Sequence, residues 1–233
     1  MAQIKEFLGR NIDILGFDAC LMAMAEIDAQ VAASTDYLVG SEDLEPGNGW
    51  PYDDFLNAMY AGNTLQDVKS VAAALVNSYG TAYDGGSQGT ENVTLATHDL
   101  AAFRDMYPAL ANLSTALNQA AKTNPAGLNT AIGSTLAFYG SDYKDLGGLV
   151  AQLQKSRGTG IDASVLNAVA TQLKNVVTSN HPTGTFTTAT GLSIWIPSEA
   201  SSSWSEYGTR YQGFTFDKET DWSKWIATLA AAK

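Results

Sequence analysis

Cysteine is almost absent from this chain of 233 residues, which contains one, Cys20. A single cysteine excludes an intramolecular disulfide, and it raises the question of a nucleophilic thiol. The other interpretation is a buried, inert side chain, which is the common fate of a free cysteine. Both interpretations of Cys20 are open at this point.

Positive charge is also sparse, with 13 Lys and Arg against 24 Asp and Glu and a net charge of −11. Nucleic-acid binding requires a basic surface, and no Lys/Arg cluster occurs, so we expect no nucleic-acid partner. No apolar run reaches the roughly 20 residues of a membrane span, so we expect no membrane partner either. No continuous apolar stretch follows Met1, so no signal peptide is visible. The acidic balance would favour cationic substrates.

The apolar fraction of 45% is enough to bury a core, and we expect one unit over residues 1–233 rather than two domains. Residues 1–100 are expected to form a βαβ core that carries Cys20. Residues 101–180 are mostly helical by pattern, and residues 181–233 supply a closing strand and a C-terminal helix. The pattern therefore predicts an α/β fold with a helical C-terminal portion.

The first hundred residues alternate between strand and helix patterns. Residues 12–17 form a short apolar run typical of a buried strand, residues 21–33 are helix formers without Gly or Pro, and residues 37–39 form a second strand. This order predicts a parallel βαβ unit with a right-handed crossover. The Pro, Gly and Asn content of residues 41–50 predicts a loop.

The remaining elements follow from caps and breakers. We expect a short helix from Pro51 to Tyr60, a helix capped by Thr64 that runs to Tyr83, and a Gly-rich loop over 84–89. A strand over 93–96 and a helix capped by Asp99 should follow. The helical region is then expected to be interrupted at 124–125, Gly140 and 158–160, before a strand over 192–197. The aromatic residues of the tail, from Tyr207 to Trp225, are expected to close an edge of the core.

Cys20 is placed where the first strand ends and the first long helix begins, and functional sites of open α/β sheets lie outside the carboxyl ends of strands. A helix N-terminus would lower the thiol pKa, and the backbone N–H of Cys20 could donate to an oxyanion. Asp18, two residues earlier, would oppose a thiolate as its base partner. It is better explained as the acid that binds a cationic substrate side chain, or as a helix N-cap. The sequence does not separate these two roles of Asp18.

Several segments of the sequence also resemble segments of a known protein family. Residues 13–22 (DILGFDACLM) resemble the nucleophile segment of the clostripain family of cysteine peptidases. Residues 41–52 (SEDLEPGNGWPY) resemble the family's loop after the next strand, and residues 93–100 (VTLATHDL) its next strand-to-helix segment. Residues 143–146, 191–197 and the tail near Trp222 are also similar. The resemblance covers residues 12–228.

The resemblance implies a caspase-like α/β/α sandwich and a secreted or cell-surface cysteine endopeptidase. It implies that Cys20 is the nucleophile and that Asp18 lies at the base of a pocket for a P1 Arg or Lys, so the partners would be peptides with basic P1 residues. The chemistry itself requires no cofactor, but some members use calcium. Here Glu42, Asp43 and Glu45 could supply oxygen ligands, or form only a solvated acidic loop.

The chain departs from the family at the catalytic partner of the thiol. A cysteine peptidase needs a base or an imidazolium partner, and the family's histidine should precede the nucleophile, yet none of the 19 residues before Cys20 is His. The N-terminal strands of the fold are missing too, which predicts an exposed apolar edge near Ile14 and Leu15. His98, expected to follow a strand, is the candidate substitute base.

We therefore interpret the chain as the C-terminal, heavy-chain part of such a peptidase. Its catalytic histidine would come from another segment, such as a separate light chain, and the isolated chain could be inactive for that reason. The alternative is a non-catalytic relic of the peptidase fold that binds basic peptides.

Overall fold

The computed structural model describes residues 1–61, 67–156, 158–197 and 202–232. In this part of the chain, the central sheet has the strand order β1-β2-β5-β8. Its strands are β1 (Ile12–Gly16), β2 (Thr35–Gly40), β5 (Ala96–Asp99) and β8 (Val177–Asn180). The β1 and β2 strands are parallel, which confirms the predicted βαβ unit, whereas β5 and β8 are antiparallel to their neighbours. The fold is therefore α/β with a mixed sheet, and β1 lies at one edge.

Two smaller sheets accompany the central one. A hairpin of β3 (Asp84–Gly86) and β4 (Gly89–Thr90) occupies the Gly-rich loop predicted over 84–89 and extends to Thr90. The second small sheet contains β6 (Ala137–Phe138), β7 (Tyr143–Asp145) and β9 (Ser193–Trp195). The predicted closing strand over 192–197 is thus present as β9, but it pairs with β7 rather than with the central sheet.

Helices make up most of the remaining described chain. They are α1 (Ala2–Leu8), α2 (Ala25–Val31), α3 (Tyr52–Ala61), α4 (Val68–Tyr83), α5 (Leu100–Thr123), α6 (Pro125–Gly133), α7 (Leu146–Lys155), α8 (Ala163–Val176), the 3₁₀ turn η2 (Gly184–Phe186), α9 (Ser202–Tyr211), α10 (Thr215–Thr220) and α11 (Trp222–Ala231). Asp99 caps α5 as predicted, because its side chain accepts from the N–H groups of Ala101 and Ala102. Asp67 caps α4, and Thr64, the predicted cap, lies outside the described residues.

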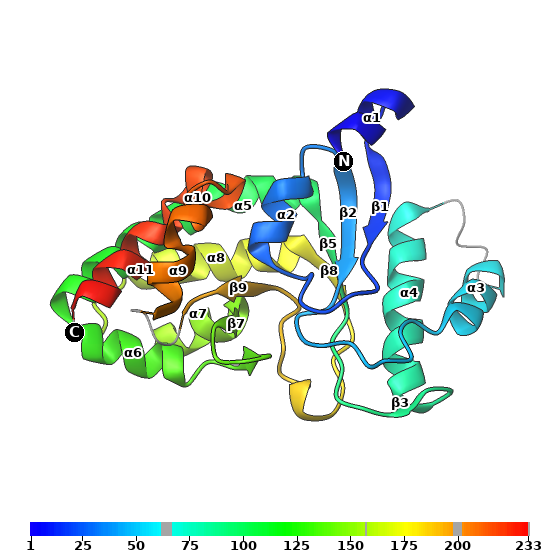
Figure 1. The fold of residues 1–233 in the computed structure, drawn as a ribbon. Coiled ribbons are helices and arrows are strands. Elements are labelled where there is room, and N and C mark those ends of the chain that lie inside the picture. The colour runs from blue at the N-terminus through cyan, green and yellow to red at the C-terminus, as the bar shows by residue number, and fades with distance from the viewer. Residues whose placement is uncertain (62–66, 157, 198–201, 233) are drawn as a thin grey trace.

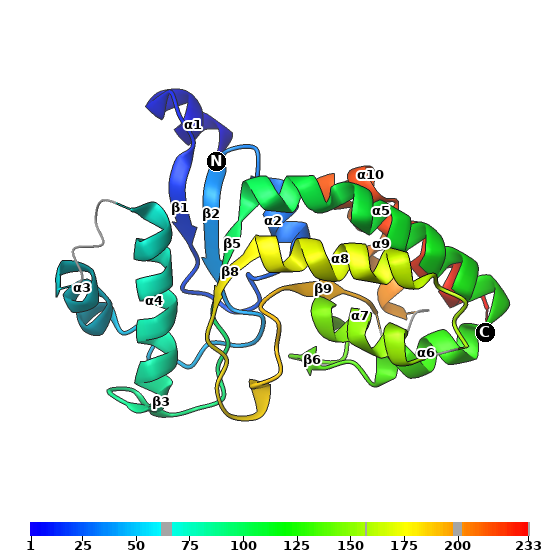
Figure 2. The ribbon, with the colours of Figure 1, turned by 180° about the vertical axis from the view of Figure 1, so that it is seen from behind.

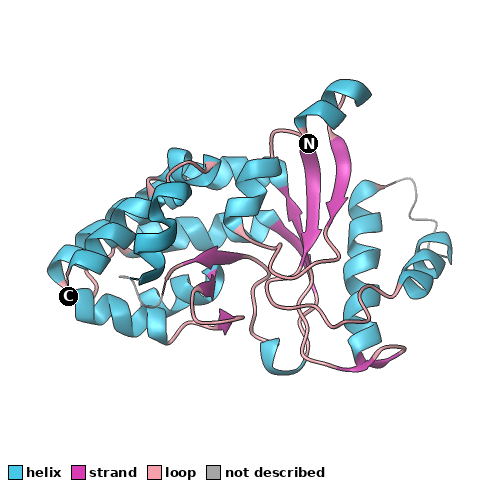
Figure 3. Cartoon of the chain, in the orientation of Figure 1, coloured by secondary structure: helices cyan, strands magenta, loops and turns pink. Residues whose placement is uncertain are grey.

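Helices cover both faces of the central sheet (Figures 1 and 2). The α4 helix lies on one face, and α2, α5 and α8 lie on the other, so the layers are helix, sheet and helix (Figure 3). The alternation of side chains along β2 fixes this arrangement. Leu38 belongs to the core under α2 and α5, whereas its neighbour Val39 belongs to the core under α4.

The core under α4 is small and aromatic, and it ends beside the loops that follow β1 and β2. Trp50, Tyr79 and Tyr83 are buried in it, and the rings of the two tyrosines lie 4.9 Å apart. The larger core continues into the C-terminal helices, where Phe216, Trp222 and Trp225 are fully buried, as expected for the aromatic tail. Tyr207 is the exception, because 45% of its surface is exposed.

Three sequence-based expectations require correction. The helix predicted over 21–33 begins only at Ala25, and the strand predicted over 93–96 lies at 96–99. The region 101–180 also contains β6, β7 and β8, which periodicity did not reveal because each strand has no more than four residues. No helix among the described residues has the length and hydropathy needed to cross a membrane.

Candidate active site

Cys20 lies in the loop that joins β1 to α2, beyond the carboxyl end of the strand. Its side chain is half-buried, and its Sγ accepts a hydrogen bond from the backbone N–H of Glu45 at 3.3 Å. Glu45 belongs to the loop that follows β2, the parallel neighbour of β1. The two loops therefore meet at the thiol, where parallel strands bring their carboxyl ends together.

The local conformation around Cys20 differs from the expected helix start. Leu21 has a left-handed backbone with φ 62°, and its N–H donates to the carbonyl of Asp43. The N–H of Ala23 donates to Ser41, and the carbonyl of Ala23 accepts from Ser193. These long-range bonds hold residues 21–24 out of the helix, whose N-cap is Met24. The helix N-terminus is therefore not at Cys20, and the expected helix-dipole effect on the thiol is not supported.

Asp18 follows β1 directly and is exposed to solvent. Its Oδ2 accepts from the hydroxyl of Tyr52 at 3.0 Å and from the backbone N–H of Trp50 at 3.4 Å. Because α2 begins seven residues later and is capped by Met24, Asp18 is not a helix N-cap. This position excludes the helix N-cap role, and the binding of a cationic substrate side chain by Asp18 stays a prediction.

Glu45 supplies a second carboxyl beside Asp18 and the Cys20 loop. Its Oε1 accepts from the indole N–H of Trp50 at 3.4 Å, and its carboxyl also forms hydrogen bonds with the Asp18 side chain and the backbone of Ala19. Burial and the neighbouring Asp18 carboxyl together raise the pKa of Glu45 to about 8. Near pH 7 Glu45 is therefore largely protonated.

A close approach of backbone to carboxylate occurs at Gly49. This residue has a left-handed φ of 65°, and a Cβ added there would lie 3.1 Å from both carboxylate oxygens of Asp18. The carbonyl of Gly49 accepts from the hydroxyl of Tyr83 at 2.8 Å. A glycine therefore allows the loop after β2 to lie against Asp18.

His98 does not lie where the sequence analysis expected. It is inside β5 rather than after it, and it is fully buried. Its Nδ1 lies 3.0 Å from Asp28 Oδ1 and its Nε2 lies 2.6 Å from the carbonyl of Gly191. Burial lowers the pKa of His98, but the Asp28 carboxylate and the Gly191 carbonyl outweigh that effect and raise it above its ordinary value. A base must reach the reacting atoms, so we do not carry His98 forward as a substitute base.

The three expected calcium ligands have separate partners. Glu42 is fully buried, where its Oε2 accepts from the N–H of Gly191, and the Asp43 Oδ1 accepts from the N–H of Tyr139. Glu45 points to Trp50, as described above. Across the described ranges, no group of three His, Cys, Asp or Glu side chains is arranged to hold a metal ion. Calcium binding by these carboxylates stays a prediction from the resemblance.

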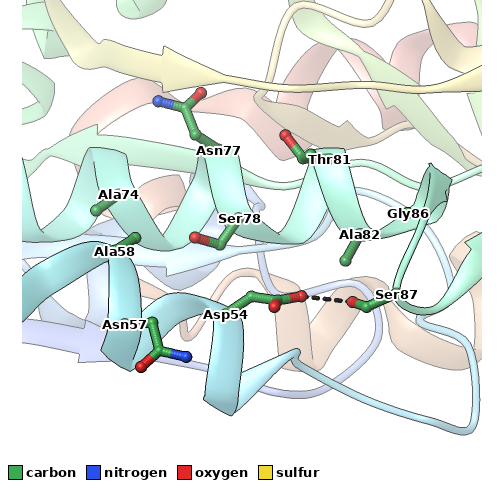
Figure 4. A pocket seen from close by; sticks show the side chains of 10 residues that line it. All are labelled: Asp54, Asn57, Ala58, Ala74, Asn77, Ser78, Thr81, Ala82, Gly86 and Ser87. Atoms are coloured by element: carbon green, nitrogen blue, oxygen red, sulfur yellow. Dashed lines mark hydrogen bonds between the residues drawn. The ribbon is translucent and has the colours of Figure 1, made fainter. Parts of the chain in front are cut away.

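A pocket of about 610 Å³ lies elsewhere, between α3, α4 and the turn of the β3–β4 hairpin (Figure 4). Small and neutral polar side chains line most of it. Its one carboxylate, Asp54, accepts a hydrogen bond from Ser87. No nucleophile with a neighbouring base lies among the lining residues, so this pocket does not compete with the loops around Cys20 as a catalytic site.

Three aromatic residues, Trp50, Tyr52 and Tyr79, also lie at the site without having been predicted there. Tyr79 is on α4 and is fully buried, yet its hydroxyl has no hydrogen-bond partner among the described residues. Burial raises its pKa, and the charges of Glu45, Asp18 and Cys20 add to that effect. Trp50 and Tyr52 were visible only as part of the resembling segment 41–52. Nothing in the local sequence marks Tyr79.

Comparisons with solved structures support the fold. A cysteine protease of B. fragilis superposes with a TM-score of 0.65 at 18% identity, over 98% of this chain and 94% of that one. A clostripain from Bacteroides thetaiotaomicron in complex with the peptide inhibitor BTN-VLTK-AOMK gives 0.66 at 19% identity, over 94% and 92%. At these identities the likeness establishes the caspase-like α/β/α fold alone.

A secreted C11 cysteine protease from Bacteroides thetaiotaomicron, solved with an irreversible peptide inhibitor, gives a TM-score of 0.66 at 22% identity. The match covers 95% of this chain but only 63% of that protease. No protein with a curated description matches the chain. The sequence model described as the clostripain family matches residues 1–228. The chain belongs to the clostripain family of cysteine peptidases.

Proposed function

We propose that this chain is the nucleophile-bearing part of a cysteine endopeptidase that cleaves after Arg or Lys. The thiolate sulfur of Cys20 forms a bond to the scissile carbonyl carbon, with the backbone N–H of Cys20 donating to the developing oxyanion. The amide C–N bond breaks, the leaving amine takes a proton from an imidazolium partner, and water then hydrolyses the thioester.

The observation that carries this proposal is the arrangement of Asp18 and Cys20. Both follow the same strand, Asp18 is exposed, and the Cys20 thiol is held by the loop that also contacts Asp18. A carboxylate there can bind a P1 cation by a charge-assisted hydrogen bond. The peptide part of the inhibitor bound to the B. thetaiotaomicron clostripain reads VLTK, which supports a basic P1 residue by analogy.

The imidazole partner is proposed to come from a segment outside this chain, such as a light chain. Two observations support this part. The chain spans only 63% of the secreted C11 protease that it resembles. In addition, β1 pairs with β2 alone among the strands of the described residues, so its other edge is available, and its residues Ile14 and Leu15 are half-buried. An additional strand at this edge would place its carboxyl end next to Cys20. By analogy with the same relative, we propose that the protease is secreted.

Hydrolysis of fluorogenic Arg- and Lys-amide substrates tests the proposal. The chain is assayed alone and together with the preceding segment or light chain, and with and without calcium. We expect turnover with the partner segment, and its complete loss in Cys20→Ala. Turnover that survives Cys20→Ala would falsify the nucleophile assignment. A folded assembly that binds basic peptides without cutting them would instead identify the non-catalytic relic.

Asp18→Ala tests the P1 assignment in the same assay. The expected result is a selective loss of kcat/KM for Arg and Lys substrates relative to a substrate with a neutral P1 side chain. An equal loss on all three substrates would show that Asp18 supports the loop and does not bind the substrate cation.

A further inference from the structure

A cavity of about 340 Å³ lies between α2, β9 and α9, and neither Asp18 nor Cys20 lines it (Figure 1). Aromatic side chains form much of its wall, namely those of Tyr143, Trp195, Tyr207, Tyr211 and Phe214. The ring centroids of Trp195 and Tyr211 lie 5.1 Å apart, and those of Tyr211 and Phe214 lie 5.7 Å apart. Small-molecule sites have volumes of roughly 300–1,000 Å³ and mainly apolar or aromatic walls with a few polar groups. This cavity therefore has the size and the walls of a ligand site.

A buried carboxyl, that of Glu26 on α2, also lines the cavity, and its side chain belongs to a residue that is only 4% exposed. Its Oε1 accepts from the hydroxyl of Tyr211 at 2.6 Å and from the backbone N–H of Trp195 at 3.0 Å. The backbone N–H of Glu26 itself also lies near the carboxyl. Its Oε2 is buried, yet it has no hydrogen-bond partner among the described residues. An unpartnered buried oxygen costs free energy, so a bound donor would stabilise this carboxyl.

The charged side chains of the cavity favour a cation as that donor. They are two carboxyls, Glu26 and Asp142, and one guanidinium, Arg210, which is exposed and therefore screened by solvent. Burial raises the pKa of Glu26, and a cation bound beside it would favour its ionised form again. The faces of tryptophan and tyrosine rings also attract a cation, most strongly where water is excluded. An anion would instead lie against two carboxyls.

We infer that this cavity binds a small organic ammonium ion. The ammonium donates to Oε2 of Glu26 and lies against the rings of Trp195 and Tyr211. The apolar part of the ligand packs on Met24 and Ile27, which supply the aliphatic part of the wall. The inference does not depend on the proposed cleavage reaction, because the carboxyl and the rings belong to neither Asp18 nor the thiol loop.

Calorimetric titration with three ligands of similar size tests the charge preference. They are 2-phenylethylamine, the neutral 2-phenylethanol and the anion 3-phenylpropionate. Because cation–π contacts and a charge-assisted hydrogen bond both require the positive charge, we expect the amine to bind about tenfold more tightly than the alcohol. The anion should not bind. An NMR shift of the backbone N–H of Trp195, which donates to Glu26, should accompany binding of the amine and locates it in this cavity.

Glu26→Gln should reduce the ratio of the two dissociation constants to about one to two, since the amide keeps an acceptor for Tyr211 and Trp195 but loses the charge. Glu219→Gln is its matched control, because it removes the same charge from an exposed glutamate on the neighbouring helix α10. It should leave the ratio unchanged. An unchanged ratio in Glu26→Gln would overturn the inference.

Tyr207→Ala gives a second test that does not disturb the core, because 45% of this side chain is exposed. It removes one aromatic wall and should weaken binding of the amine about threefold. Tyr60→Ala is its control, since Tyr60 is 73% exposed on α3 and does not line the cavity. Equal affinity of the wild-type chain for amine and alcohol, binding without a shift at Trp195, or no binding of the amine would each contradict the inference.

Discussion

The backbone N–H of Glu45 donates to the thiol sulfur of Cys20 across 3.3 Å, so the loops after β1 and β2 are joined at the nucleophile itself. A change that displaces the second loop should therefore act on the thiol and on Asp18 together. Trp50, in the same loop, and Tyr52, the first residue of α3, both donate to Asp18. This coupling makes the loop a sensitive place to test the site.

Gly49→Ala should weaken the site through Asp18. The left-handed backbone of Gly49 costs an alanine about 1–2 kcal/mol, and the added Cβ would lie 3.1 Å from both carboxylate oxygens of Asp18. We expect lower stability in urea unfolding and a lower kcat/KM for the Arg- and Lys-amide substrates. Gly47→Ala is the control, because a Cβ there meets nothing within 4 Å. Equal effects of the two substitutions would show that the contact with Asp18 does not matter.

His98→Gln should reduce stability and leave catalysis intact. His98 and Asp28 are both fully buried and form a pair at 3.0 Å. Removing one partner of a buried ion pair costs about 3–5 kcal/mol, because the other charge is left uncompensated. Urea unfolding measures the loss, and the double variant with Asp28→Asn should lose less. A stable His98→Gln protein without turnover would instead restore His98 as the catalytic base.

Glu42→Gln should change how stability depends on pH. Burial raises the pKa of Glu42 well above its ordinary value of 4.5, and the nearby Asp145 adds to that effect. The native state therefore keeps a proton that the unfolded chain releases, so this stabilisation is complete below pH 4.5 and is lost as pH rises through the higher native pKa. We expect Glu42→Gln to have an unchanged Tm at pH 4 and a higher Tm than the wild type at pH 8.

Glu91→Gln serves as the control for the pH measurement, since Glu91 is exposed. It should leave the difference in Tm between pH 4 and pH 8 as it is in the wild type. If Glu42→Gln has the same pH dependence as the wild type, then Glu42 does not retain its proton in the native state, and the buried carboxyl is ionised.

The fold followed from the sequence where signals were local. The apolar run before Cys20, the cap at Asp99 and the resembling segments gave the parallel βαβ unit and the start of α5. The helix after Cys20 was predicted too early, because the bonds from Leu21 and Ala23 to the loop after β2 are long-range and leave no local pattern. Tertiary hydrogen bonds thus overrode the helix propensity of residues 21–24.

The candidate site was predicted in part for the same reason. Asp18 and Cys20 are two residues apart, so their proximity is visible in the sequence. Glu45 was considered only as a calcium ligand, because its contact with Cys20 arises from the parallel pairing of β1 and β2. His98 was misplaced because the strand lies three residues later than its pattern indicated, which moves the histidine from the edge into the sheet.

Tyr79→Phe tests whether the buried Tyr79 hydroxyl contributes to the stability of the free chain. The Tyr79 hydroxyl is buried without a partner among the described residues, so its removal should leave the stability of the free chain unchanged or slightly higher. Tyr83→Phe, the matched control on the same helix, loses the bond to the Gly49 carbonyl at 2.8 Å and should cost about 1 kcal/mol.

Urea unfolding of the two variants beside the wild type measures both effects. A large loss of stability in Tyr79→Phe would mean that its hydroxyl already has a partner in the free protein.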